Sequence, residues 1–161
     1  MQEGRRTQVA RSNKLALFAI ALAVILADQI SKAWALAVLG DGRRISIIGE
    51  TFDLRLVMNP GSAFGLFRGA TLWIALASSV IVVVVIVWAL RDPSAPIWLG
   101  LVIGGGVGNL IDRLIQPPGG GRGHVVDFIY LSFWPTFNLA DAAISVGVVL
   151  LMVQAFREDR S

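Results

Sequence analysis

An uncharged, largely apolar segment at residues 70–90 constrains the fold of this chain more than any other feature. An α-helix of this length spans about 30 Å, the thickness of the hydrocarbon core of a membrane. Three more apolar segments of comparable length lie at residues 15–39, 97–115 and 139–156. The sequence therefore predicts an all-α integral membrane protein with four transmembrane helices.

The balance of residue types fits a membrane protein. Hydrophobic residues make up 55% of the chain and charged residues 16%, whereas soluble domains average roughly 45–50% and 25%. The formal net charge of +3 does not indicate a nucleic-acid-binding surface, which needs clustered basic residues. The 161 residues are predicted to form a single polytopic membrane domain, residues 1–161, that is a monomer and binds no nucleic acid.

Glycines are concentrated in the third apolar segment, at Gly104, Gly105, Gly106 and Gly108. Inside a membrane, small residues allow helix backbones to approach one another closely. We therefore expect residues 97–115 to form the packing centre of the bundle.

Four basic residues precede the first apolar segment: Arg5, Arg6, Arg11 and Lys14. Because cytoplasmic flanks of membrane spans are enriched in Lys and Arg, both termini are predicted to be cytoplasmic. A cleavable signal peptide, with Ala35-Leu36-Ala37 as its cleavage site, is an alternative interpretation of this segment. Asp28 and Lys32 argue against it, since such a peptide normally carries no charge there.

Polar residues gather at one end of the predicted bundle. Asp28 lies late in the first span, Asn109 and Asp112 lie late in the third, and Asp141 begins the fourth. Since successive spans run in opposite directions, these residues reach the same side of the membrane. Asp127 lies in the loop on that side, which the orientation above makes the outer side.

The connections on that side differ from the short inner loop. In the stretch 40–69, Phe52 and Leu54 alternate with Asp53 and Arg55, a pattern typical of a strand. We expect a small extracytoplasmic β-sheet there. Residues 116–138 are expected to form an outer loop, with a flexible tract at 117–121 (Pro-Pro-Gly-Gly-Gly).

Ionisable residues inside a membrane are costly and need a partner or a function. Asp28 and Lys32 are four residues apart, which places them on one helical face in the favourable order for an ion pair. A structural pair and a direct chemical role both fit this spacing. Asp112 and Arg113 are likewise expected either to pair with groups on neighbouring helices or to act chemically.

Asp127 and Asp141 are the strongest candidates for chemistry. Asp127 lies in an apolar run, which desolvates its carboxyl and raises its pKa. Asp141 follows Asn138, a candidate N-cap, so its carboxylate lies in the first turn of a helix, where it either caps the helix or acts chemically. Such a pair can activate water without a metal or cofactor, and the chain has no Cys and only one His, His124.

Five short motifs occur in order along the chain. They are Asp28-Gln29 with Lys32, residues 59–65 (Asn-Pro-Gly-Ser-Ala-Phe-Gly), residues 105–113 (Gly-Gly-Val-Gly-Asn-Leu-Ile-Asp-Arg), residues 125–128 (Val-Val-Asp-Phe) and residues 137–141 (Phe-Asn-Leu-Ala-Asp). Together they resemble the successive motifs of the lipoprotein signal peptidases, also called signal peptidase II. The chain departs from the family pattern between Arg113 and Val125, where it is longer by the Pro-Gly tract.

The resemblance implies an aspartic endopeptidase of the bacterial cytoplasmic membrane, with its active site towards the outer face and four helices below a small sheet. Its substrate would be a diacylglyceryl-modified prolipoprotein in membrane lipid, cleaved just before the modified cysteine. Asp127 and Asp141 match the catalytic aspartates. The positions that match substrate-binding or supporting residues are Asn59, Asn109, Arg113, Asn138, Asp28, Lys32, Asp112 and Gly108.

Two points stay open at this level. Asn59 precedes Pro60-Gly61, so it either makes a turn or directs its amide at the substrate. A small ion-coupled transporter and a non-catalytic assembly factor are the alternative functions, because intramembrane aspartates also occur in transporters. Transport, however, needs polar groups near the midplane, whereas these lie at one end.

Overall fold

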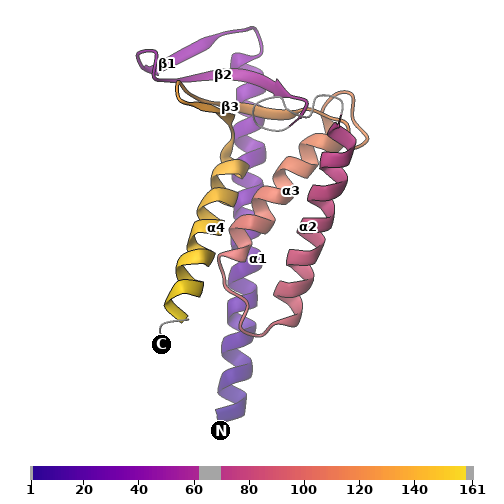
Figure 1. The fold of residues 1–161 in the computed structure, drawn as a ribbon, viewed down its shortest axis with the longest axis vertical. Coiled ribbons are helices and arrows are strands. Elements are labelled where there is room, and N and C mark those ends of the chain that lie inside the picture. Colours follow the sequence, from indigo (N-terminus) through magenta and orange to yellow (C-terminus); the bar gives the residue numbers. More distant parts are fainter. Residues whose placement is uncertain (1, 62–69, 159–161) are drawn as a thin grey trace.

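Four long helices run side by side in the computed structural model, and an antiparallel sheet covers one end of the bundle (Figure 1). The structure describes residues 2–61 and 70–158, so positions 62–65 of the second motif lie outside it. The helices are α1 (Gln2–Leu39), α2 (Thr71–Arg91), α3 (Leu99–Ile115) and α4 (Leu139–Glu158), and the strands are β1 (Arg44–Ile48), β2 (Phe52–Asn59), β3 (Val125–Leu131) and β4 (Trp134–Phe137).

Three of the described helical segments are long and apolar enough to cross a membrane: Ser12–Leu39, Thr71–Arg91 and Leu139–Glu158. They correspond to the first, second and fourth predicted spans. The third predicted span forms α3, which has only 17 residues. The structure thus confirms a mostly helical protein with several membrane-length helices and a small sheet, and it supports three of the four predicted spans.

The glycines of α3 contact each of the other helices. A Cβ added at Gly104 would lie 2.7 Å from the carbonyl oxygen of Ala21 in α1, and one added at Gly105 would collide with the carbonyl oxygen of Ala140 in α4. Gly106 is similarly close to a side chain of α2. The prediction that this segment forms the packing centre is confirmed.

The sheet has the strand order β1-β2-β3-β4, and all its neighbouring strands are antiparallel. β1 and β2 come from the stretch in which a sheet was expected. The expectation that residues 116–138 form only a loop is wrong, because β3 and β4 lie within them. β3 pairs along β2, with Val57 opposite Asp127, and it is this pairing over a long sequence separation that converts the apolar run into a strand.

The Pro-Gly tract at 117–121 also differs from the expectation of a flexible loop. Its glycines have positive φ angles, 84° at Gly121 for example, which other residues rarely adopt. The backbone N–H groups of Gly121 and Gly123 both donate to the carbonyl oxygen of Arg113, each over 2.9 Å. The tract is therefore a compact, hydrogen-bonded loop that closes the C-terminal end of α3.

Candidate active site

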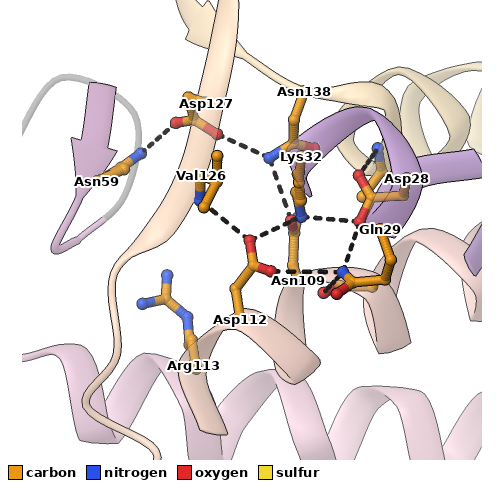
Figure 2. A network of polar contacts seen from close by, with 12 residues as sticks. Asp28, Gln29, Lys32, Asn59, Asn109, Asp112, Arg113, Val126, Asp127 and Asn138 are labelled. Atoms are coloured by element: carbon orange, nitrogen blue, oxygen red, sulfur yellow. Dashed lines mark hydrogen bonds and ion pairs between the residues drawn. The ribbon is translucent and has the colours of Figure 1, made fainter. Parts of the chain in front are cut away.

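A buried lysine lies at the centre of the polar network beneath the sheet (Figure 2). The side chain of Lys32 is 2% exposed, and its Nζ lies 2.8 Å from Asp28, 2.9 Å from Asp112 and 3.0 Å from the Oδ1 atom of Asn109. The predicted pair between Asp28 and Lys32 is confirmed, and Asp112 pairs with a group on a neighbouring helix, as expected. A charge buried this deeply is stable only when it is paired in this way.

The two aspartates of this network also hold the backbone of the elements that carry the candidate catalytic residues. Asp28 Oδ1 accepts the N–H of Ala140 over 3.0 Å, at the start of α4. Asp112 Oδ2 accepts the N–H of Val126 over 3.0 Å, in β3. Because Asp141 and Asp127 follow these two residues directly, the Lys32 network positions both of them.

Gln29 is a member of this network that the sequence analysis did not assign to the site. Its Nε2 atom donates to Asp28 Oδ2 over 3.1 Å, to the Gly108 carbonyl oxygen over 3.2 Å and to Asp112 Oδ1 over 3.3 Å. Gly108 has no room for a side chain here, since a Cβ would lie 2.6 Å from Asp28 Oδ2. A polar residue beside Asp28 within an apolar segment was the available signal.

Asp127 lies on β3 and is 2% exposed. Asn59 Nδ2 donates to its Oδ2 over 2.9 Å, and Asn138 Nδ2 donates to its Oδ1 over 2.7 Å (Figure 2). Burial raises the pKa of Asp127 to about 7, and the charge of Asp141 acts in the same direction against the two amide hydrogen bonds. The carboxyl therefore keeps its proton to a higher pH than an ordinary aspartate does.

Asp141 lies in the first turn of α4, where Asn138 is the N-cap that the sequence predicted. Asn138 Oδ1 accepts the backbone N–H of Asp141 over 2.9 Å, and the backbone N–H of Asn138 donates to Asp141 Oδ2 over 3.4 Å. Asn109 Nδ2 donates to the other oxygen, Oδ1, over 2.8 Å. Because Asn138 also binds Asp127, one side chain contacts both candidate catalytic residues.

Arg113 and Asn59 fix the backbone around this pair. The guanidinium of Arg113 is buried and donates to the carbonyl oxygens of Gly61, over 3.0 Å, and Gly123, over 3.4 Å. Its partners are therefore loop carbonyls, and not groups on neighbouring helices as expected. The side chain of Asn59 accepts the N–H of Gly61 over 3.0 Å, so it forms a turn and at the same time holds Asp127.

Both aspartates line one cavity of about 240 Å³ at the sheet end of the bundle. Its polar lining includes five predicted site residues, namely Asn59, Asn109, Arg113, Asp127 and Asp141. The remaining lining residues are Gly61, Ile74, Val125, Trp134, Pro135, Thr136 and Phe137. The four lining residues that belong to β4 were missed by the sequence analysis, because that strand was not expected. The cavity combines two carboxyl groups, amide donors and an apolar wall, which suits the hydrolysis of a peptide bond.

Residues 20–157 match the family model described as signal peptidase (SPase) II. The chain belongs to the signal peptidase II family. Two similar relatives are both named lipoprotein signal peptidase. One, from Rhodococcus jostii, is 43% identical over 148 residues, which are 90% of this chain and 74% of the relative. The other, from Mycobacterium tuberculosis, is 41% identical over 140 residues, which are 85% of this chain and 69% of the relative.

Solved structures support the fold of this signal peptidase II family member. One bacterial membrane enzyme superposes with a TM-score of 0.74 and 24% identity, covering 89% of this chain and 88% of that one. A second gives a TM-score of 0.73 at 24% identity, covering 86% and 91%. The resemblance inferred from the five motifs is therefore confirmed. The chain is a membrane peptidase of a family that processes lipoproteins.

Proposed function

We propose that this protein is an aspartic endopeptidase that removes the signal peptide from diacylglyceryl-modified prolipoproteins, cutting just before the modified cysteine. The observation that carries the proposal is the shared cavity, in which Asp127 and Asp141 are both bonded to Asn138. The relatives named lipoprotein signal peptidase support the substrate class.

In the proposed mechanism the two aspartates have different protonation states. Asp127 holds a proton, which agrees with the pKa of about 7 that its burial produces. Asp141 is ionised, in the first turn of α4, where it accepts N–H groups from Asn109 and Asn138. Two interacting carboxyls titrate as a pair, so the working form is the state in which they carry one proton between them.

The reaction then adds water across the peptide bond. Asp141 takes a proton from water while the water oxygen attacks the carbonyl carbon, and protonated Asp127 donates a hydrogen bond to the carbonyl oxygen, on which negative charge develops. When the tetrahedral intermediate breaks down, the C–N bond is cleaved and the proton from water is passed to the departing amine of the cysteine. Neither a metal nor a covalent intermediate takes part.

The supporting residues have positioning roles in this proposal. Asn59, Asn109 and Asn138 orient the two carboxyls. The Lys32 network, with Asp28, Asp112 and Gly108, holds the elements that carry them. The guanidinium of Arg113 fixes the rim of the cavity.

We also propose that α3 is the fourth membrane span and that residues 1–161 form one monomeric domain of a bacterial cytoplasmic membrane. At 1.5 Å per residue, its 17 residues extend about 26 Å, close to the thickness of the hydrocarbon core. Its contacts with the other three helices favour a position at the same depth in the membrane as those helices. The basic residues before the first span favour cytoplasmic termini, which directs the aspartate cavity to the outer face.

The substrate claim is tested with the purified full chain and one lipoprotein precursor in two forms. The first form carries the diacylglyceryl group on its cysteine, and the second is the same precursor before lipid modification. We expect release of the signal peptide from the first form only, with the modified cysteine as the new N-terminal residue by mass spectrometry. No product from the lipidated form, together with ion flux into vesicles containing the protein, would indicate a transporter instead.

The pH dependence of cleavage offers a test of the role of Asp127. Because the reaction needs its proton, kcat/KM is expected to fall as the pH rises through about 7. In Asn59→Ala the carboxylate loses an N–H donor worth roughly 1.5 kcal/mol, and one pKa unit is about 1.4 kcal/mol. The pH at which kcat/KM falls, the alkaline limb of the pH profile, should therefore rise by roughly one unit.

A matched control for this shift is Thr136→Ala, which changes another residue that lines the cavity. Its alkaline limb is expected to coincide with that of the parent. An alkaline limb near pH 7 in Asn59→Ala would show that the Asn59 amide does not influence the titrating group.

A further inference from the structure

A second cavity, of about 530 Å³, lies at the sheet end of α2. Most of its lining residues come from the first turn of this helix and from the compact loop that follows α3. These two segments lie next to each other in Figure 1. Among the residues that the structure describes, this second cavity shares no lining residue with the aspartate cavity. Its lining residues are Pro60, Thr71, Leu72, Trp73, Pro118, Arg122 and His124.

The polar chemistry of this cavity suits an anion. Two basic residues, Arg122 and His124, line the cavity, and none of the described lining residues is a carboxylate. Within the described part of the chain, neither side chain makes a hydrogen bond or an ion pair. A guanidinium binds phosphate through paired N–H groups, and an imidazole can add a further donor.

The loop places these two residues in the lining of the same cavity as the first turn of α2. A Cβ at Gly121 would lie 3.2 Å from Cδ1 of Leu72, so the loop backbone packs directly on the first turn of the helix. The backbone N–H groups of Arg122 and His124 donate to the carbonyl oxygens of Gly119, over 3.0 Å, and Pro117, over 3.3 Å. The Pro-Gly tract thus fixes the backbone at both basic positions.

The surface below the cavity is apolar and faces outward. Trp73, Leu76 and Val80 are three and four residues apart on one face of α2, and they are 71%, 48% and 62% exposed. α2 is long and apolar enough to cross a membrane, so this face lies against lipid chains. The cavity is at the end of the span, where phospholipid headgroups and interfacial tryptophans are found.

We propose that this cavity binds the headgroup phosphate of an anionic phospholipid, whose acyl chains lie along Trp73, Leu76 and Val80. The guanidinium of Arg122 selects negative charge, and the continuous apolar face selects a lipid over a soluble anion. A bound lipid bridges α2 and the loop through Arg122 and His124, and the same loop leads into β3. The proposal concerns a site separate from the aspartate cavity, so its test does not depend on peptidase activity.

The test is a native mass spectrometry titration of the full chain in detergent with phosphatidylglycerol and, separately, phosphatidylcholine. The parent is expected to bind the first phosphatidylglycerol at least tenfold more tightly than phosphatidylcholine. In Arg122→Gln/His124→Gln this preference should disappear. Arg157→Gln removes an exposed arginine near the opposite end of the bundle, and this control should keep it.

A second readout does not depend on the double variant. Brominated phosphatidylglycerol should quench tryptophan fluorescence more strongly than brominated phosphatidylcholine, and Trp73→Phe should remove most of that difference. Equal binding of both lipids by the parent would overturn the proposal, as would an unchanged preference in a folded double variant. Displacement of the lipid by an equal concentration of inorganic phosphate would overturn it too, because the site would then bind a free anion.

Discussion

Replacing either Asp127 or Asp141 with Asn is expected to lower kcat for cleavage of a lipid-modified precursor by about a thousandfold or more. The amide has nearly the same size as the carboxyl and its oxygen still accepts one N–H donor at each position, so the variants should insert and purify like the parent. Asp127→Asn loses the acidic proton, and Asp141→Asn loses the carboxylate that accepts a proton from water. Steady-state cleavage assays at matched protein concentration measure the effect.

Asp53→Asn is the matched control for these substitutions. Asp53 is as buried as Asp127, but it lies on β2 outside the cavity lining, where Arg44 and Arg55 bind it over 2.6 Å. The hydrogen bond from Arg55 lowers the pKa of Asp53, which identifies a structural carboxylate. Its variant should keep the kcat of the parent per folded molecule. Substantial turnover by a folded Asp127 or Asp141 variant would remove that residue from the mechanism.

Lys32→Met is expected to have the largest effect on stability. Methionine fills a similar volume, but it leaves Asp28 and Asp112 buried without their cation. Breaking a buried ion pair in this way costs about 3–5 kcal/mol, or a decrease in Tm of roughly 10 °C for a chain of this size. Thermal unfolding in detergent measures the loss, and activity should fall with it because the network holds β3 and α4.

Two further variants distinguish the loss of these buried ion pairs from a general effect of losing a lysine. Lys14→Met changes the only other lysine in the sequence, which lies on the surface near the opposite end of the bundle, and it should shift Tm by no more than a few degrees. Adding Asp112→Asn to Lys32→Met removes one of the unpaired charges and should recover part of the stability. If Lys32→Met melts at the temperature of the parent, the network is not needed for folding.

Much of the fold was predictable because its signals are local. The apolar segments, the ion pair between Asp28 and Lys32 and the helix cap at Asn138 each depend on residues within a few positions of one another. The convergence of Asp127 and Asp141 on one side also followed from the alternating direction of the spans. These features need no knowledge of tertiary contacts.

The remaining features depend on contacts between distant segments. The apolar run around Asp127 fits a buried strand or a helix segment equally well by periodicity, and only its pairing with β2 decides. In the same way, Asp112 was expected either to pair with a group on a neighbouring helix or to act chemically, and the sequence did not identify Lys32 as its partner. The order of the Pro-Gly tract comes from hydrogen bonds to the end of α3, which its composition does not reveal.

The account rests on Asp127 holding a proton, up to a pH of about 7, beside an ionised Asp141. Infrared difference spectroscopy of the protein in lipid measures this directly, because a protonated carboxyl and a carboxylate have separate bands. We predict a protonated-carboxyl band that is lost with a midpoint near pH 7 and is missing from Asp127→Asn. A band that persists in Asp127→Asn, or a midpoint close to the ordinary aspartate value of about 3.9, would contradict the account.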